Sequence, residues 1–187
     1  YACLLRVNVI KEDFVYDLKR SGCTRIQFGL ESGNEYVRNT IMKRNLREKD
    51  IFRAFNLVKE YGIQANAFNI IGVPGETESM IWDTIKLNRK LNPEGGSGVN
   101  IFFPYKGTPL GDYAFNNGLV DEKLFEDETR ERRVSVLKWP YFYRIKLKFY
   151  RDAWQILLYP WRLSGYKAFV WDRFINTKMG FVLRYLH

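Results

Sequence analysis

The sequence predicts an α/β fold in which four parallel strands alternate with helices and a basic helical tail follows. Short apolar runs alternate with segments of helical periodicity along residues 1–103, and each helical segment ends at a glycine or at an Asn-Pro pair. Strands that alternate with helices in this way form a parallel sheet with right-handed crossovers. Because four strands are half of an eight-stranded barrel, we expect a partial barrel that stays open.

The first strand and the first helix occupy the front of the chain. Residues 1–9 form an apolar, β-prone run that predicts a strand. Residues 11–21 follow with Phe14, Val15 and Leu18 on one helical face. The chain starts inside the strand and without an initiator Met, so we expect the front of the natural protein to lie outside these residues.

The second strand is predicted over residues 25–30, and a helix follows it. Asn45 and Glu48 have the spacing of a capping box, in which each side chain accepts a backbone N–H at the start of the helix. This helix should end at Gly62. Its apolar stripe consists of Ile51, Ala54, Phe55 and Val58.

The last strand–helix–strand unit begins with a strand over residues 63–72. A helix over residues 77–91 follows and stops at Asn92-Pro93, and the fourth strand is predicted over residues 98–103. The residues of this helix that should point inward are Ile81, Ile85 and Leu91.

The composition is that of a globular protein. Apolar residues make up 46% of the chain and charged residues 27%, which excludes a disordered chain. The two cysteines, Cys3 and Cys23, are too few for a disulfide scaffold and too far apart for a zinc or cluster motif. We interpret them as reduced thiols of a cytoplasmic protein. No secretory signal opens the chain, and no apolar run is long enough to span a membrane.

The net charge of +9 is confined to the end of the chain. Residues 1–130 hold 18 Lys and Arg and 18 Asp and Glu, whereas residues 131–187 hold 12 and 3 and also 15 of the 31 aromatic residues. We therefore predict a division into a barrel part, residues 1–120, and a basic aromatic extension, residues 121–187.

The extension is predicted to be helical. Residues 122–138 are charged and helix-prone, an amphipathic helix begins at Tyr141 and ends at Pro160, and a second helix follows a turn at residues 164–165. The apolar face of the amphipathic helix is Phe142, Ile145, Phe149, Ala153 and Ile156, and its basic face is Arg144, Lys148 and Arg151. Such a helix suits either a lid over the barrel or attachment to an anionic membrane surface.

The segments that follow the strands form the candidate site, because ligands of parallel α/β folds bind at the carboxyl ends of the strands. These segments are residues 29–34 (GLESGN), 70–77 (IIGVPGET) and 103–110 (FPYKGTPL). Glu31 offers a carboxylate to hydroxyl groups or to an ammonium group. Each segment alone has an equally good structural interpretation, with Ser32 or Asn34 as a helix cap and Glu76 as an acidic residue at a helix start.

In this order and spacing, the segments resemble the radical S-adenosylmethionine (radical SAM) superfamily. The resemblance extends from Tyr1 to about Val120 and includes Gly22-Cys23, Met42-Lys43-Arg44 and Asn92-Pro93 besides the three segments above. It implies that the four strands are strands three to six of a partial triosephosphate-isomerase (TIM)-type barrel. The sequences of the motifs are most similar to those of members that carry a cobalamin-binding domain before the barrel.

The resemblance implies a binding site for S-adenosylmethionine. Glu31 and Ser32 would contact its ribose or amino-acid part, and Arg6 would reach its carboxylate. The contacts to adenine and ribose would come from Ile71, Gly72, Val73, Phe103, Pro104 and Tyr105. Phe68 stands where the family has the first glycine of this strand, and Glu76 falls one place late, so for Glu76 we prefer the helix start.

The resemblance also implies a [4Fe–4S] cluster held by three closely spaced cysteines. Cys3 and Cys23 cannot supply this triad, and we interpret Cys23 as a buried structural thiol. We therefore expect no metal ligand in this chain, and we expect the cluster ligands, and any cobalamin domain, to lie outside it. The chain alone should then be inactive.

The preferred function is that of a complete radical SAM enzyme that reductively cleaves S-adenosylmethionine. It would start methyl transfer or cyclisation on an organic substrate, a small molecule that is anionic or lipid-like. A radical SAM enzyme that modifies RNA is an alternative, but the basic residues do not form an RNA-binding module, so we do not expect a nucleic-acid partner. A non-catalytic module that binds a surface is a further alternative. The expected location is cytoplasmic, with residues 141–187 at the inner face of the membrane in the surface-binding case.

Overall fold

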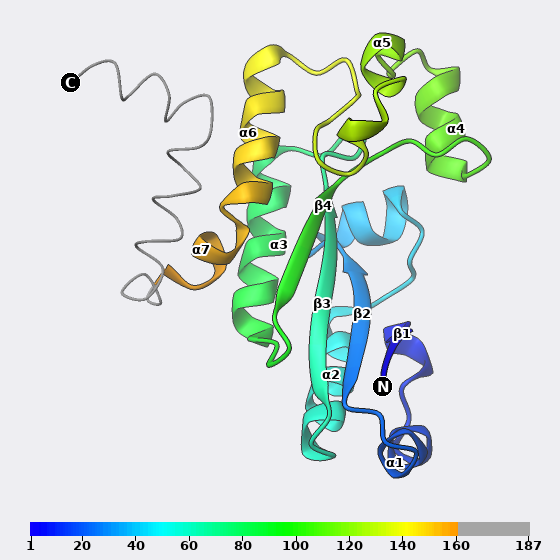
Figure 1. Cartoon of the computed structure of the whole chain (residues 1–187), viewed down its shortest axis with the longest axis vertical. Helices are drawn as coiled ribbons and strands as arrows, with labels where there is room; N and C mark the ends of the chain where they lie inside the picture. The colour runs from blue at the N-terminus through cyan, green and yellow to red at the C-terminus, as the bar shows by residue number, and fades with distance from the viewer. Residues whose placement is uncertain (161–187) are drawn as a thin grey trace.

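The computed structural model describes residues 1–160, and in this part of the chain four strands form one parallel sheet in the order β1-β2-β3-β4 (Figure 1). The strands are β1 (Ala2–Leu5), β2 (Arg25–Glu31), β3 (Gln64–Ile71) and β4 (Ser97–Ile101). Because β1 and β4 are the two edges of the sheet, the barrel is open. The predicted α/β partial barrel is confirmed.

Helices α1 (Glu12–Arg20), α2 (Glu48–Glu60) and α3 (Glu78–Leu91) connect the strands and bury one face of the sheet. Side chains alternate along β2, so Ile26, Phe28 and Leu30 are fully buried on the helix side. The predicted stripe of α2 is buried against them, and the Phe28 and Phe55 ring centroids lie 4.9 Å apart. Burial of each such side chain stabilises the fold by roughly 1.5–3 kcal/mol.

A buried polar network attaches the last helices to β4. Helices α6 (Tyr141–Asp152) and α7 (Trp154–Leu158) lie beside α3 on the outer side of this edge strand (Figure 1). The Trp154 Nε1 donates to the Ser97 Oγ at 3.1 Å, and the Asn69 Nδ2 donates to the same oxygen at 3.1 Å. Buried polar groups are costly unless they are paired, so this network fixes where α7 packs.

Two predictions at the front of the chain were wrong in detail. The first strand ends at Leu5, and a 3-10 turn, η1 (Val7–Val9), follows because the chain bends to bury Val7 and Ile10 in the core. The capping box is not formed. Helix α2 starts at Glu48 without a side-chain cap, and Asn45 has a left-handed φ of 49°.

Residues 122–138 do not form the predicted long helix. They contain only α5 (Glu122–Phe125) and the 3-10 turn η3 (Glu128–Arg130). The chain then extends beside Val120, which forms a bridge with Leu137, and this path buries Val136 and Leu137. A π-helical segment, η2 (Val37–Ile41), and helix α4 (Pro109–Asn116) were not predicted.

Helix α6 is present, but it buries a different face from the predicted one. Leu147 and Tyr150 are buried, whereas Phe142, Ile145 and Phe149 are 78%, 43% and 49% exposed. The buried face is preferred because tyrosine hydroxyl groups on it reach partners on α3 and its preceding turn. The Tyr150 hydroxyl donates to a Glu78 carboxylate oxygen at 2.5 Å, for example.

The amphipathic helix is also interrupted, since Ala153 separates α6 from α7. The predicted turn at residues 164–165 and the helix after it lie outside the described residues. Among the residues that the structure describes, no helix is long and apolar enough to cross a membrane.

Candidate functional site

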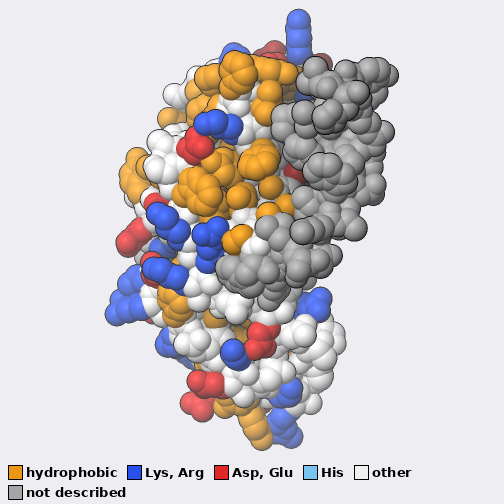
Figure 2. Space-filling model, turned by 90° about the vertical axis from the view of Figure 1, so that its left-hand side faces the viewer, with side chains coloured by type: hydrophobic (Ala, Val, Ile, Leu, Met, Phe, Trp, Pro, Cys, Tyr) orange, Lys and Arg blue, Asp and Glu red, His pale blue; other side chains and the backbone are white. Residues whose placement is uncertain are grey.

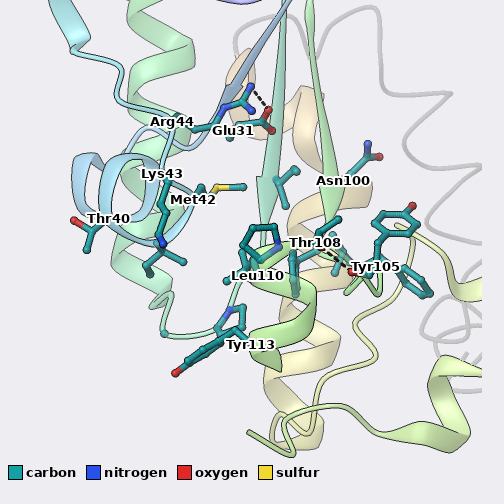
Figure 3. A pocket seen from close by; sticks show the side chains of 18 of the residues that line it. Glu31, Thr40, Met42, Lys43, Arg44, Asn100, Tyr105, Thr108, Leu110 and Tyr113 are labelled. Carbon is teal, nitrogen blue, oxygen red and sulfur yellow. Dashed lines mark hydrogen bonds and ion pairs between the residues drawn. The ribbon is translucent and has the colours of Figure 1, made fainter. Parts of the chain in front are cut away.

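A cavity of about 840 Å³ opens at the carboxyl ends of β2, β3 and β4 (Figure 3). Its walls come from the ends of these strands, the loop that follows η2, the turn after β3 and the start of α4. Figure 1 shows α4 and α5 beyond the ends of the strands. The site predicted from strand order therefore coincides with a real cavity.

Glu31 lies at the end of β2 and lines this cavity. The register between β2 and β3 shifts between Gly29 and Glu31, and Glu31 has a left-handed φ of 66°. Its Oε1 lies 2.8 Å from the Nη2 of Arg44, which also lines the cavity (Figure 3). Burial raises the pKa of Glu31, and the charge of Arg44 acts in the opposite direction.

The position of Arg44 depends on a second arginine that is almost fully buried. Arg38 on η2 donates through Nε to the Leu46 carbonyl at 2.8 Å and through Nη1 to the Ser32 and Gly33 carbonyls at 2.8 and 3.1 Å. It thereby joins the two ends of the loop that carries Arg44. Burial lowers the pKa of Arg38. The sequence pattern indicates no role for either arginine, although Arg44 belongs to a motif of the resemblance.

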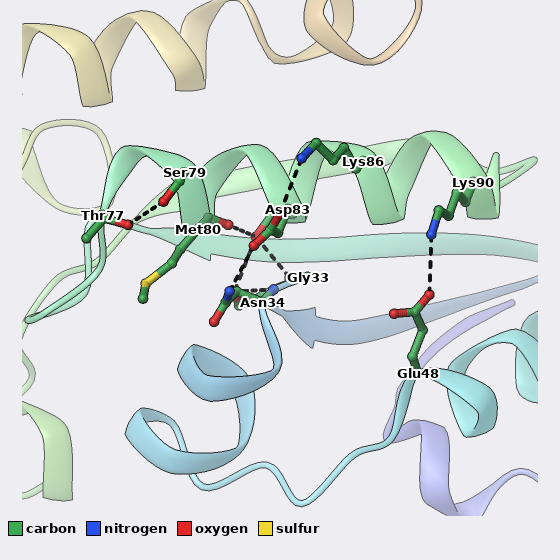
Figure 4. Close-up of polar contacts among 11 residues, drawn as sticks. Gly33, Asn34, Glu48, Thr77, Ser79, Met80, Asp83, Lys86 and Lys90 are labelled. Carbon is green, nitrogen blue, oxygen red and sulfur yellow. Dashed lines mark hydrogen bonds and ion pairs between the residues drawn. The ribbon is translucent and has the colours of Figure 1, made fainter.

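Residues 32–34 after β2 are anchored on α3 (Figure 4). The Gly33 N donates to the Thr84 Oγ1 at 2.9 Å, and the Asn34 Nδ2 donates to the Asp83 Oδ2 at 2.9 Å. A Cβ on Gly33 would lie 2.5 Å from the Asp83 carbonyl oxygen, so only glycine allows this close contact.

Ser32 is fully buried against the same helix, with its Oγ 3.2 Å from the Thr84 Oγ1. It does not line the cavity. The Asn34 Oδ1 accepts the Val37 N–H at the start of η2, as a cap does. The structural interpretation of the Ser32–Asn34 run therefore has direct support, and a role for Ser32 in cofactor binding stays a prediction.

Of the predicted residues after β3, none lines the cavity with its side chain. Ile71 and Val73 point into packed clusters, and the cavity wall is formed by Ile70, Pro74 and Gly75 instead. Strand alternation explains the difference, because neighbouring residues of β3 point to opposite faces. Cofactor contacts from Ile71, Gly72 and Val73 stay predictions.

Glu76 closes the turn that carries these residues. Its Oε2 accepts the Gly72 N–H at 2.5 Å, and its Oε1 has no partner among the described residues. Burial raises the pKa of Glu76 to about 7, although the Gly72 and Val73 N–H groups act in the opposite direction. The preferred helix start was wrong, because α3 begins at Glu78 after Thr77 and Glu76 precedes both.

The predicted residues after β4 divide into two groups. Phe103 and Tyr105 line the cavity, and Phe103 stacks on Phe125 with ring centroids 5.1 Å apart. Pro104 is buried and does not line it. Arg6 follows the carboxyl end of β1, but it is exposed and outside the cavity.

The two cysteines lie side by side, away from the cavity. Their Sγ atoms are 3.7 Å apart, Cys23 is buried as predicted, and Cys3 is partly buried. In the part of the chain that the structure describes, no group of three His, Cys, Asp or Glu side chains could hold a metal ion.

Comparison with known proteins assigns the family. The model of the radical SAM superfamily matches residues 2–87, which contain β1 to β3 and the Glu31–Arg44 pair. Residues 2–87 belong to the radical SAM superfamily. The chain is 34% identical over 115 residues to an uncharacterized methyltransferase of Pyrococcus horikoshii, covering 62% of this chain and 25% of the relative.

Two further proteins extend the likeness. The chain is 27% identical over 104 residues to biotin synthase of Persephonella marina, covering 56% of this chain and 30% of the relative. Coproporphyrinogen III oxidase (HemN) of Escherichia coli, a radical SAM enzyme, has a similar fold, with a TM-score of 0.56 at 20% identity. The match covers 83% of this chain and 31% of HemN. The chain thus spans about a quarter to a third of the length of these proteins.

Membership in the radical SAM superfamily implies S-adenosylmethionine and a [4Fe–4S] cluster as cofactors. The cavity fits the first, because a carboxylate and a guanidinium stand beside an apolar wall. The cluster does not fit the residues of this chain, because two cysteines cannot supply three thiolates.

Proposed function

We propose that the whole protein is a radical SAM enzyme and that this chain contributes the part of the barrel that holds the methionine and ribose of S-adenosylmethionine. The observation that carries the proposal is the Glu31–Arg44 ion pair in the cavity at the strand ends. The cofactor, when bound and reduced at a cluster held outside these residues, supplies a carbon-centred radical to an organic substrate.

The two charged side chains have complementary tasks in this proposal. The Glu31 carboxylate would accept hydrogen bonds from the α-ammonium group, and the Arg44 guanidinium would donate to the α-carboxylate. Each side chain of the ion pair would then contact an oppositely charged group of the cofactor, and the contact between the two side chains would weaken. The buried Arg38 holds the loop in place, so this arrangement exists before the cofactor arrives.

Methyl transfer is the reaction class that we favour. Its support is the methyltransferase name of the Pyrococcus horikoshii relative and the similarity of the motifs to members with a cobalamin-binding domain. Cobalamin is thus part of the proposal, and its domain, like the cluster ligands, would lie outside these 187 residues. Cyclisation is the second reaction class.

Calorimetric titration of the full chain with S-adenosylmethionine tests the proposed site. Arg44→Gln should weaken binding about tenfold or more, because a hydrogen bond to a charged group contributes roughly 1.5–3 kcal/mol. Arg47→Gln is the matched control, since Arg47 is three residues away, exposed and outside the cavity. Equal affinities of the two variants would contradict the proposal.

We also propose that the outer face of α6 binds an anionic membrane surface. Phe142, Ile145 and Phe149 are exposed in a row, and Figure 2 shows hydrophobic side chains gathered on this side of the molecule with Lys and Arg beside them. No residue of α6 or α7 lines the cavity, which argues against a lid formed by these two helices. Residues 131–187 hold 12 Lys and Arg against 3 Asp and Glu, and this excess complements an anionic surface.

A further inference from the structure

The cavity contains more positive charge than its carboxylate can neutralise. The charged side chains that line it are Glu31, Lys43, Arg44 and Arg132. Glu31 is already paired with Arg44 at 2.8 Å. Lys43 forms no ion pair with any described residue, and Arg132 has only the exposed Glu131 beside it, whose Oε1 lies 3.4 Å from Nε. Two cations therefore face the cavity beyond the pair that we assign to the cofactor.

Arg132 is attached to the end of β4 and to Tyr105. Its carbonyl accepts the Ile101 N–H at 3.0 Å, which attaches this residue to the end of β4, and its φ of 58° is left-handed. Its Nε donates to the Tyr105 hydroxyl at 2.7 Å, and its guanidinium carbon lies 5.5 Å from the centre of the Tyr105 ring. Neither Nη atom donates to a described residue, so both remain available to a ligand.

The wall between the cations is largely aromatic. Phe103 and Tyr105 line it from the segment after β4, Tyr113 lines it from α4, and Tyr36 lines it from the position directly before η2. Figure 3 shows Lys43 on the side of Arg44, and Tyr105 and Asn100 on the opposite side. At about 840 Å³, the cavity is near the upper end of the range of about 300–1,000 Å³ for pockets that bind a drug-sized ligand.

We propose that Lys43 and Arg132 bind an anionic group of the substrate, a carboxylate or a phosphate, and that the aromatic wall packs against its apolar or aromatic body. This rests on the proposed function, because it assigns to the substrate the part of the cavity that S-adenosylmethionine leaves open. A guanidinium with both Nη atoms available binds carboxylate and phosphate oxygens in a bidentate manner. Neutral or cationic substrates would be disfavoured by the two charges.

This site is tested by titrating the full chain with three ligands and monitoring each titration by ligand-observed NMR. The ligands are 2-naphthoate, 2-naphthyl phosphate and uncharged 2-naphthamide. Both anions should bind more tightly than the amide, and the better of the two identifies the anionic group. Arg132→Gln should weaken the anions about tenfold and leave the amide unchanged, since it removes only the charged donors. Arg133→Gln is the control, because Arg133 is exposed and outside the cavity.

The same proteins should be titrated with S-adenosylmethionine. Its affinity should be unchanged by Arg132→Gln, which separates this site from the Glu31–Arg44 pair. If the anions bind in a manner that depends on Arg132 but S-adenosylmethionine does not bind, the proposed function is refuted and the anion site is supported. Equal affinities for naphthoate and naphthamide, or equal effects of the two arginine variants, would overturn the anion site.

Discussion

The Arg44 guanidinium lies 2.8 Å from the Glu31 carboxylate although 13 positions separate the two residues in the chain. The loop between them returns to the end of β2 because Arg38 binds the carbonyls at both of its ends. The pair therefore belongs to the framework of the cavity, and its two charges face a ligand together.

Substitution of Gly72 should reveal how tightly α6 packs on the turn after β3. Gly72 has φ 79°, and an added Cβ would lie 2.9 Å from the Leu147 Cδ1, whereas at Gly75, with φ 83°, the nearest atom would be 3.7 Å away. A left-handed backbone costs an alanine roughly 1–2 kcal/mol, so Gly75→Ala should lose about that much stability. Gly72→Ala should lose about 1–3 kcal/mol more from overpacking.

Urea denaturation of both alanine variants measures this difference. Similar losses would show that α6 yields to the added methyl group and does not fix the turn.

Glu76 should make stability depend on pH between about pH 4.5 and 7. Its folded pKa of about 7 is above the ordinary value of 4.5, so the folded protein binds this proton more tightly than the unfolded chain does. The contribution of Glu76 to the free energy of unfolding is therefore greatest below pH 4.5 and is lost as the pH rises through 7. The loss is on the order of 3 kcal/mol.

Glu76→Gln removes this titration and keeps an oxygen that accepts the Gly72 N–H. Relative to the parent protein, the free energy of unfolding of this variant should therefore rise between pH 5 and pH 8. Glu60→Gln, at the exposed end of α2, provides the control. A constant difference across this range would mean that the Glu76 carboxylate is stably ionised in the fold.

The membrane proposal predicts that vesicles with phosphatidylserine bind the full chain and that phosphatidylcholine vesicles do not. Phe142→Ser with Phe149→Ser should abolish co-sedimentation, because insertion of each ring contributes roughly 1.5–3 kcal/mol. Added salt should also weaken binding, since exposed charges are screened. Tyr16→Ser on α1 alters an equally exposed ring elsewhere and should have no effect. Failure of the parent protein to sediment with anionic vesicles would refute the proposal.

The fold was predictable because its signals are local. Periodicity and glycine stops placed the helices and strands of the sheet, and strand order placed Glu31 at the cavity. The roles of Arg38 and Arg44 were not predictable, because the loop that holds them contains a π-helical segment and left-handed residues that no periodicity reveals.

The buried face of α6 was predicted wrongly for another reason. Helix α6 has two apolar stripes, and the sequence alone does not say which one the sheet will bury. The choice depends on tertiary partners such as Glu78, which binds Tyr150, and Gly72, where a Cβ would lie 2.9 Å from the Leu147 Cδ1. Hydrophobic spacing predicts a helix, but it predicts the buried face only when the helix has a single apolar stripe.

The affinities of S-adenosylmethionine and 5′-methylthioadenosine, measured side by side, test the central claim most directly. The second ligand lacks the amino and carboxylate groups that we assign to Glu31 and Arg44. The parent chain should therefore prefer S-adenosylmethionine by about tenfold or more, and Glu31→Gln and Arg44→Gln should each lose most of this preference while they retain 5′-methylthioadenosine binding. A preference that is absent in the parent chain, or that both variants keep in full, would contradict the assignment of this pair to the cofactor.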